Sequence, residues 1–147
     1  MDLMWTEQLS VGNAILDSDH KKLFELAKDI DCATKARDHS AVLLAVKRLN
    51  ACMNHHFLNE KLFAHALNIP FMKHQQDHKN ILAEINLTQY EMGKDGVTAI
   101  YVMEHYAQFL WDWLIKHITD EDMLMKPVLQ TCPYDLKIDG ADACGCC

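Results

Sequence analysis

The segment "HHFLNEKLF", residues 55–63, places an imidazole and a carboxylate on one side of an otherwise apolar helix. His56 and Glu60 are four residues apart, so in a helix they lie one above the other on the same face. Polar groups that point into a hydrophobic core need partners there, because burying them alone costs free energy. Other segments of the chain must therefore supply partners for this pair.

The composition favours a single helical domain. The chain has 147 residues, 50% of them hydrophobic, with only five glycines and three prolines. A chain of this length can bury a substantial core, and few glycines and prolines suit long helices. The net charge of −7 and the lack of a basic cluster argue against nucleic acid as a partner.

The sequence gives no sign of export or of a membrane span. Its start lacks a basic region followed by an unbroken apolar run, and no window approaches the roughly 20 apolar residues of a membrane span. We therefore expect a cytoplasmic protein, whose six cysteines are mostly reduced. Cys32 and Cys52 fall in helical stretches, where we expect both to be buried as small hydrophobic residues.

Hydrophobic periodicity predicts an all-α fold. Apolar residues recur at spacings of three and four in four segments, which short breaks separate. Four helices of about 20 residues with short turns favour an antiparallel up-down-up-down four-helix bundle. The bundle would take in residues 1–131, with residues 1–17 as an N-terminal arm and residues 132–147 as a Cys-rich C-terminal tail. The helices are expected at about 18–37, 40–67, 71–92 and 97–117, with Asp17, Ser18 and Asp95 as N-terminal caps.

Seven polar residues should converge at one end of this bundle. Because neighbouring helices alternate in direction, the start of the first and third helices meets the end of the second and fourth. A buried cluster of imidazoles and carboxylates needs compensation, and metal ions provide it. Seven ligands exceed what one ion takes, so two carboxylate-bridged ions fit better, and these donors favour iron or manganese. The alternative is a set of hydrogen-bonded core residues that all reach one level without a metal. The residues are His20, His56, Glu60, His74, His78, His117 and Asp122.

The order of these motifs resembles the hemerythrins, specifically the single-domain bacterial hemerythrins. The motifs are "LDSDH", "HHFLNE", "HQQDH" and "WLIKHITDED", preceded by the arm "W…SVGN", and the resemblance covers about residues 1–129. Two positions depart from the family pattern without touching a ligand. Asp19 stands where many relatives carry Gln, and Lys61 stands where a second Glu is frequent.

The resemblance implies a non-haem di-iron centre that binds dioxygen reversibly, with a hydroxide or oxide as an additional bridge. One iron would have three histidines, and the other would have two histidines and an open position. Two carboxylates would bridge both ions. The implied assignments are His74, His78 and His117 for the first iron, His20 and His56 for the second, and Glu60 and Asp122 for the bridges.

An apolar pocket is expected around the open iron. Helical spacing points to two leucines, each one turn from a predicted ligand, and the resemblance adds two aromatic residues and an isoleucine. Packing in the core is compatible with lining such a pocket. The expected pocket residues are Leu23, Phe57, Trp113, Leu114 and Ile118.

Three uses of such a centre stay open: an oxygen carrier or store, a sensor, or enzyme-like handling of peroxide, nitric oxide or iron. The carrier is favoured, because the chain shows no output domain. The donor set also differs from the E-x-x-H sites of ferritin-like proteins and from the H-E-x-x-H sites of zinc hydrolases. We therefore expect no enzymatic activity, dioxygen as the ligand, and an oxygen-consuming protein as the recipient.

The Cys-rich tail lies outside the family pattern. Its last four residues, "CGCC", put three thiols close together, and Cys132 is a fourth. The tail is either a reduced appendage or a second site for a soft metal or for disulfide exchange, because clustered thiolates suit such chemistry.

Overall fold

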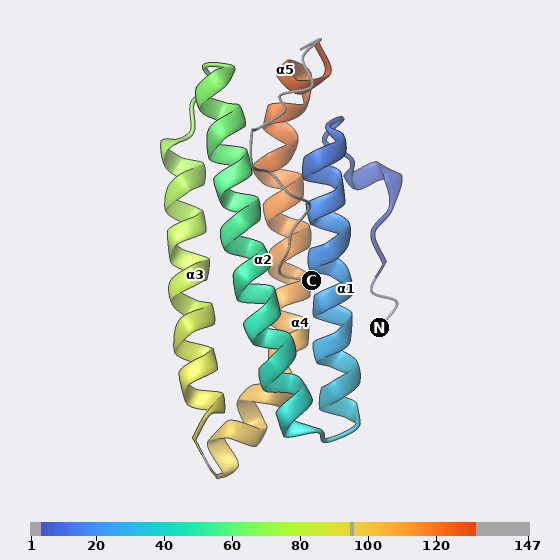
Figure 1. Ribbon diagram of the computed structural model, residues 1–147, viewed down its shortest axis with the longest axis vertical. Helices are drawn as coiled ribbons and strands as arrows, with labels where there is room; N and C mark the ends of the chain where they lie inside the picture. Colours follow the sequence, from blue (N-terminus) through green and yellow to red (C-terminus); the bar gives the residue numbers. More distant parts are fainter. Residues whose placement is uncertain (1–3, 95, 132–147) are drawn as a thin grey trace.

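The computed structural model describes residues 4–94 and 96–131, which form an antiparallel bundle of four long helices (Figure 1). Each helix runs opposite to its neighbours along the chain, and α1 packs against α2 and α4, while α3 packs against α2 and α4. The predicted all-α up-down-up-down bundle is confirmed. The long helices are α1 (Ala14–Lys35), α2 (His39–Ala66), α3 (Met72–Met92) and α4 (Val97–Asp120).

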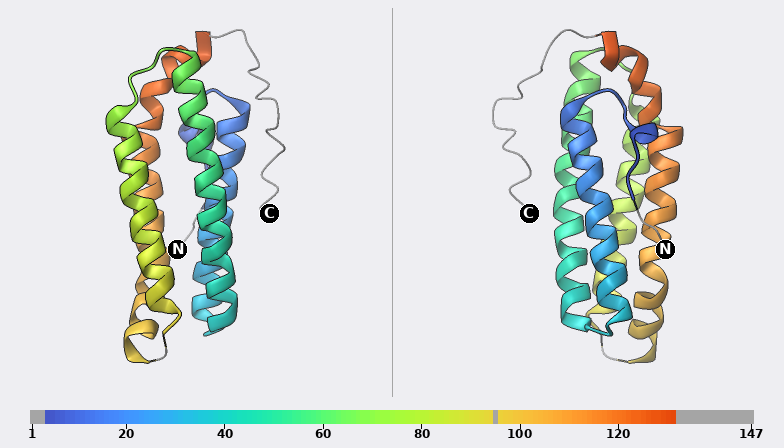
Figure 2. Two further views of the ribbon diagram at one scale, coloured as in Figure 1. Left: turned by 60° about the vertical axis from the view of Figure 1, so that its left-hand side comes forward. Right: turned by 90° about the vertical axis from the view of Figure 1, so that its right-hand side faces the viewer.

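Short elements complete the upper end of the bundle. The 3-10 helix η1 (Glu7–Leu9) lies in the N-terminal arm, which Figure 2 shows on the side formed by α1 and α4. After α4 the chain forms the 3-10 helix η2 (Asp122–Met125) and then α5 (Lys126–Thr131). The segment of η2 and α5 folds over the end at which α1 begins and α4 ends (Figure 1), where its Met125 and Leu129 pack in one cluster with Leu16 and Phe63.

The N-terminal cap of α1 differs from the prediction. The helix begins at Ala14, and the side chain of Asn13 accepts hydrogen bonds from the backbone N–H groups of Ile15 and Leu16 at 3.0 and 3.1 Å. Asp17 instead lies in the first turn, where its carboxylate accepts hydrogen bonds from the Ser10 hydroxyl and the Val11 N–H. Asn is as good a cap as Asp or Ser, and the contacts of Asp17 with the arm decided between them. The arm therefore ends at Asn13, not at residue 17.

The other helix bounds agree with the prediction to within a few residues, and the predicted cap Asp95 lies outside the described residues. Each of the three turns between the long helices has a residue with a backbone conformation that most residues avoid: Arg37, after α1, has a φ of 55°, Asn68, after α2, has a φ of 54°, and Gly96, before α4, has a φ of 126°. Asn and Gly are the residues that tolerate positive φ best. These turns are short, so the helices they join are antiparallel neighbours.

The core has two parts. The larger hydrophobic cluster runs between the four helices and includes Leu23, Leu49, Ile85 and Leu110, all at most 2% exposed. A second cluster joins the arm, the end of α2 and α5 above the first. Between them lies the level at which the seven predicted ligands meet, so that level is closed by apolar residues from both sides.

The two cysteines predicted to be buried differ: Cys52 is buried, but Cys32 is exposed. The helical pattern placed both in helices, and the rotation of α1 against the core turned Cys32 outward. The tail of residues 132–147, with its four cysteines, lies outside the described residues.

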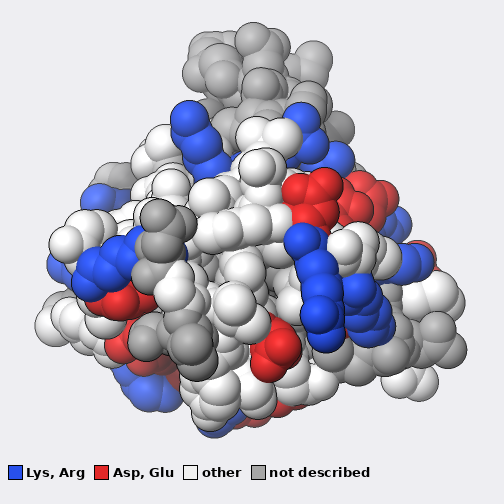
Figure 3. Space-filling model, turned by 90° about the horizontal axis from the view of Figure 1, so that it is seen from below, with Lys and Arg blue, Asp and Glu red and all other residues white. Residues whose placement is uncertain are grey.

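At the end opposite to the predicted ligands, the described residues present both signs of charge (Figure 3). Seen from below, basic and acidic side chains lie next to each other on the end that carries the α1–α2 and α3–α4 turns (Figure 3). Within the described ranges, none of the helices is both long and apolar enough to cross a membrane.

Candidate metal centre

All seven predicted ligands meet inside the upper end of the bundle. They come from all four long helices and from η2, and their exposure ranges from 0% to 6%. Their donor atoms form two overlapping groups in which every atom lies within 4.8 Å of the others. The three-histidine group consists of Glu60, His74, His78, His117 and Asp122, and the two-histidine group consists of His20, His56, Glu60 and Asp122.

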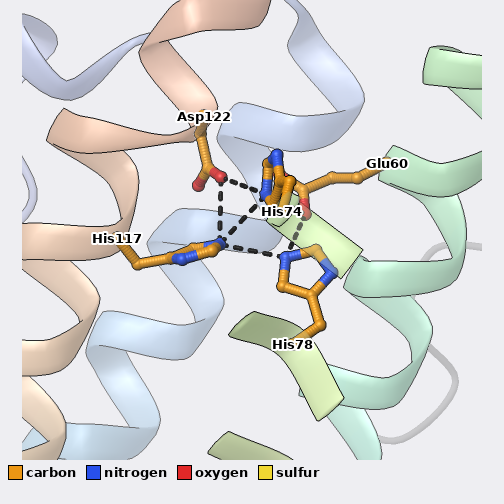
Figure 4. Close-up of side chains that lie close together, drawn as sticks. All are labelled: Glu60, His74, His78, His117 and Asp122. Carbon is orange, nitrogen blue, oxygen red and sulfur yellow. Dashed lines mark hydrogen bonds and ion pairs between the residues drawn. The ribbon is translucent and has the colours of Figure 1, made fainter. Parts of the chain in front are cut away.

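The three-histidine group turns its Nε2 atoms toward one point (Figure 4). The Nε2 atom of His117 lies 3.1 Å from that of His74 and 2.9 Å from that of His78. Asp122 places Oδ1 2.9 Å from His74 Nε2 and 3.1 Å from His117 Nε2, while Glu60 Oε2 lies 3.1 Å from His78 Nε2. Three nitrogens and two oxygens therefore surround a space of the size of one ion.

The two-histidine group uses the other oxygen of each carboxylate. Asp122 Oδ2 lies 3.1 Å from His20 Nε2, and Glu60 Oε1 lies 3.4 Å from His56 Nε2. The rings of these two histidines are in edge contact, with centroids 4.6 Å apart. Each carboxylate thus presents one oxygen to each group, which is the geometry of a ligand that bridges two cations.

The donor atoms fit a metal better than they fit one another. Both oxygens of Glu60 and both of Asp122 are buried and have no hydrogen-bond partner among the described residues. Burial lowers the pKa of His56 to about 4, and burial together with His117 and His74 lowers the pKa of His78. These two imidazoles are neutral at pH 7, so each ring has one N–H group and one lone pair. With the proton on Nδ1, the Nε2 lone pair faces carboxylate oxygens and neighbouring Nε2 atoms. A cation satisfies such a set, and an uncharged core does not.

The two carboxylates have opposite pKa shifts. Burial and the nearby charge of Asp122 raise the pKa of Glu60 well above its ordinary value. Burial alone would also raise the pKa of Asp122, but the proximity of His117, His20 and His74 lowers it well below the ordinary value. Two like charges in one core repel each other. Without a metal, Glu60 is therefore the carboxylate whose ionisation is disfavoured, while Asp122 stays ionised.

Sequence reasoning missed the residues that support the histidine rings from outside. Asp19 Oδ2 lies 3.3 Å from His56 Nδ1 and accepts a hydrogen bond from the side-chain amide of Asn59 at 2.9 Å. Phe71 packs against His74, with ring centroids 4.5 Å apart. The sequence held a weak signal, because Asp19 and Asn59 each directly precede a predicted ligand. Which ring they would support depends on how α1 and α2 face each other.

The five predicted pocket residues divide into two sets. Leu23, Leu114 and Ile118 are 1–2% exposed and belong to the main core cluster. Phe57 instead stacks on His78, with centroids 3.7 Å apart and planes at 6°, and Trp113 stacks on His117 at 4.5 Å and 12°. Both aromatic rings therefore stack on the three-histidine group, and the Phe57 ring also lies 5.7 Å, between centroids, from the ring of His56 in the two-histidine group. A role in an oxygen pocket stays a prediction for all five.

The remaining histidines lie outside the cluster. His39 Nε2 contacts the Met92 carbonyl oxygen at 2.8 Å, and His105 Nδ1 contacts the carbonyl oxygen of the preceding turn. His55 contacts the Asn59 amide, and His65 is exposed. All four are surface or hydrogen-bonded histidines.

Comparison with known families agrees with this geometry. A model of the Hemerythrin HHE cation binding domain matches residues 11–129. The chain belongs to this family. A Bacteriohemerythrin of Pseudomonas aeruginosa (strain LESB58) is 22% identical over 123 residues, which cover 82% of this chain and 76% of that protein. A Bacteriohemerythrin of Campylobacter jejuni (serotype O:23/36, strain 81-176) is 26% identical over 117 residues, covering 78% of this chain and 85% of that protein.

A eukaryotic relative extends the comparison. A Hemerythrin-like protein of Naegleria gruberi is 27% identical over 125 residues, which cover 85% of this chain and 92% of that protein. All seven predicted ligands of this hemerythrin lie within the matched region, and the Cys-rich tail lies beyond it. The predicted family is confirmed, and the buried cluster fits a cation site of the kind that the family name describes.

Proposed function

We propose that this hemerythrin binds dioxygen reversibly at a pair of iron ions and so transports, stores or delivers oxygen. The observation that supports the proposal best is the composition of the buried cluster, in which five imidazoles and two shared carboxylates leave two positions for cations. Imidazole and carboxylate together are donors that suit iron. The proposed ligands are His74, His78 and His117 for one iron, His20 and His56 for the other, and Glu60 and Asp122 for both.

The unequal number of histidines supports an open position at one ion. The two-histidine group offers four protein ligands where the three-histidine group offers five. An ion that prefers six ligands would therefore have more room for an external molecule in the two-histidine group. A pair of ferrous ions would be able to supply two electrons to a bound dioxygen molecule, one from each ion.

The surroundings favour binding over catalysis. Leu23, Leu114 and Ile118 are almost completely buried, so they keep water and its protons away from a bound molecule. Both carboxylates of the cluster are shared between the two groups, and the nearby Asp19 is engaged by His56 and Asn59. In the described part of the chain, the two groups therefore leave no carboxylate of their own to act as a general base.

A single experiment tests the proposal. The protein is loaded anaerobically with ferrous iron, the iron is counted, and visible spectra are recorded as oxygen is admitted and then removed with argon. We expect two irons per chain and an absorption band that appears with oxygen and disappears without it. Immediate and irreversible oxidation would contradict the carrier function and favour a sensor or an enzyme.

Matched histidine variants provide the control. His56→Ala removes a proposed ligand of the second iron and should abolish the reversible band. His65→Ala changes an exposed histidine outside the cluster and should leave the spectrum unchanged. An unchanged spectrum in His56→Ala would argue against the two-histidine group as the oxygen site.

A further inference from the structure

We infer that Asp19 is a positioning residue for one half of the centre: its carboxylate holds His56 in the tautomer and orientation that aim Nε2 at the metal. The inference rests on the proposed metal-binding function and adds a residue to it. Asp19 is not one of the seven proposed ligands, and neither metal-binding group includes it.

The two nitrogens of His56 face different carboxylates. Its Nδ1 atom lies 3.3 Å from Asp19 Oδ2, and its Nε2 atom lies 3.4 Å from Glu60 Oε1, inside the two-histidine group. A neutral imidazole carries one proton, and an ionised carboxylate can only accept a hydrogen bond. With the proton on Nδ1 and donated to Asp19, the Nε2 lone pair is free for a metal ion. A carboxylate behind a ligating histidine has this effect in metal sites generally.

Asp19 is itself held in place. The Asn59 side-chain amide donates a hydrogen bond to Asp19 Oδ2 at 2.9 Å and also contacts His55 Nδ1 at 3.4 Å. Asn59 is only 2% exposed, and the Asp19 side chain is 11% exposed. His56, Asn59 and Glu60 lie in one turn of α2. The helix therefore fixes the relative positions of the proposed ligand His56, the Asn59 amide that binds Asp19, and the proposed bridge Glu60. Asp19 joins this turn to α1, next to the proposed ligand His20.

The support is confined to one side of the centre. Among the described residues, Asp19 is the one carboxylate within 4.0 Å of an Nδ1 atom of the cluster, since every other carboxylate contact of these histidines uses Nε2. The histidines of the three-histidine group pack instead against Phe57, Phe71 and Trp113. A hydrogen-bonded carboxylate makes an imidazole a stronger electron donor. Asp19 therefore strengthens the group that has one histidine fewer.

The test measures metal affinity and needs no oxygen. Ferrous ions are titrated anaerobically into the metal-free protein in competition with a chelator, which gives two dissociation constants. In Asp19→Asn we expect the affinity for one ion to fall about 10- to 100-fold and the affinity for the other to stay unchanged. Asp29→Asn removes the same charge from an exposed position of α1 and should change neither constant.

A double-mutant cycle separates positioning from a general structural role. If Asp19 acts through His56, Asp19→Asn should cause no further loss of affinity in a His56→Ala background. Asp19→Glu keeps the carboxylate and should retain more affinity than Asp19→Asn. Far-ultraviolet circular dichroism of each metal-free variant checks that the helices are intact.

The outcomes distinguish this inference from the proposed function. Equal loss at both ions in Asp19→Asn, no loss at either, or the same loss in the His56→Ala background would overturn the role of Asp19 alone. A parent protein that binds fewer than two ferrous ions would overturn the di-iron proposal as well.

Discussion

Replacing Glu60 with Gln should stabilise the metal-free protein and weaken the metal-bound one. Glu60 is completely buried, neither of its oxygens has a hydrogen-bond partner among the described residues, and the Asp122 carboxylate lies beside it. Gln has the same shape without the charge, and its NH₂ group can donate to Asp122. Both metal-binding groups include the Glu60 carboxylate. The same change therefore removes an anionic ligand from each group.

The pKa of Glu60 sets the size of the gain. Its ordinary pKa is 4.5, and burial raises the pKa in the folded protein well above that value. A raised pKa destabilises the folded state by at most about 1.4 kcal/mol for each pH unit above the ordinary pKa, which sets an upper limit of about 3 kcal/mol at pH 7. The folded state then holds more protons than the unfolded state, so stability falls as the pH rises above 4.5. The gain in Glu60→Gln should therefore be largest at neutral pH and disappear near pH 4.5.

Chemical denaturation, followed by far-ultraviolet circular dichroism, measures both effects. The free energy of unfolding is determined for the parent and Glu60→Gln with a chelator present, and again anaerobically with ferrous iron. In the parent, each ion should add about 2.7 kcal/mol when its free concentration is 100 times the dissociation constant. Glu60→Gln should gain much less, so the order of stability reverses between the two conditions. Glu84→Gln, at an exposed position of α3, is the matched control.

Two results would refute this reasoning. A metal-free Glu60→Gln protein that is less stable than the parent at pH 7 would mean that the Glu60 carboxylate is satisfied in the core. Equal stabilisation of both proteins by iron would mean that Glu60 does not bridge the two groups.

Three further predictions concern the core, the pH dependence and the tail. Leu114 is only 2% exposed, so Leu114→Ala should lower the free energy of unfolding by about 2–5 kcal/mol. The cavity should also shorten the lifetime of the oxygenated protein, which is measured as the decay of its visible band. An equal lifetime would mean that Leu114 is a core residue only. Metal-free Glu60→Gln lacks the opposing titration of Glu60 and should lose about 3 kcal/mol of stability through His56 as the pH falls from 6.5 to 4, because burial lowers the pKa of His56 from 6.5 to about 4 and the unfolded chain binds the proton first; denaturation of this variant at several pH values checks this, and a flat profile would contradict it. Truncation after Thr131 should leave the iron content unchanged, since all seven proposed ligands precede it; elemental analysis that shows a loss of iron would point to a tail that takes part in the centre.

Most of the fold and the identity of the clustered residues could be read from the sequence. Helical periodicity is a local property, because each residue advances the helix by a fixed rotation. The spacing of His56 from Glu60 and of His74 from His78 therefore fixed which face of each helix they share. Short turns then fixed the antiparallel order, and that order brought the ends of the four helices together.

Other features depended on how the helices are rotated and offset against one another. The same periodicity placed Cys32 and Cys52 in helices, yet only the packing of α1 left Cys32 exposed. Asn13 became the cap of α1 because the arm engaged Asp17. The spacing of residues along one helix carries no information on such contacts between segments.

The division is sharpest at the metal centre. The sequence was sufficient to predict that five imidazoles and two carboxylates share one level of the core. Only the tertiary structure decided that Phe57 and Trp113 stack on the three-histidine group, and that Asp19 reaches the far nitrogen of His56. A contact of that kind depends on a few ångströms of offset between two helices, and side-chain packing over the whole core sets that offset.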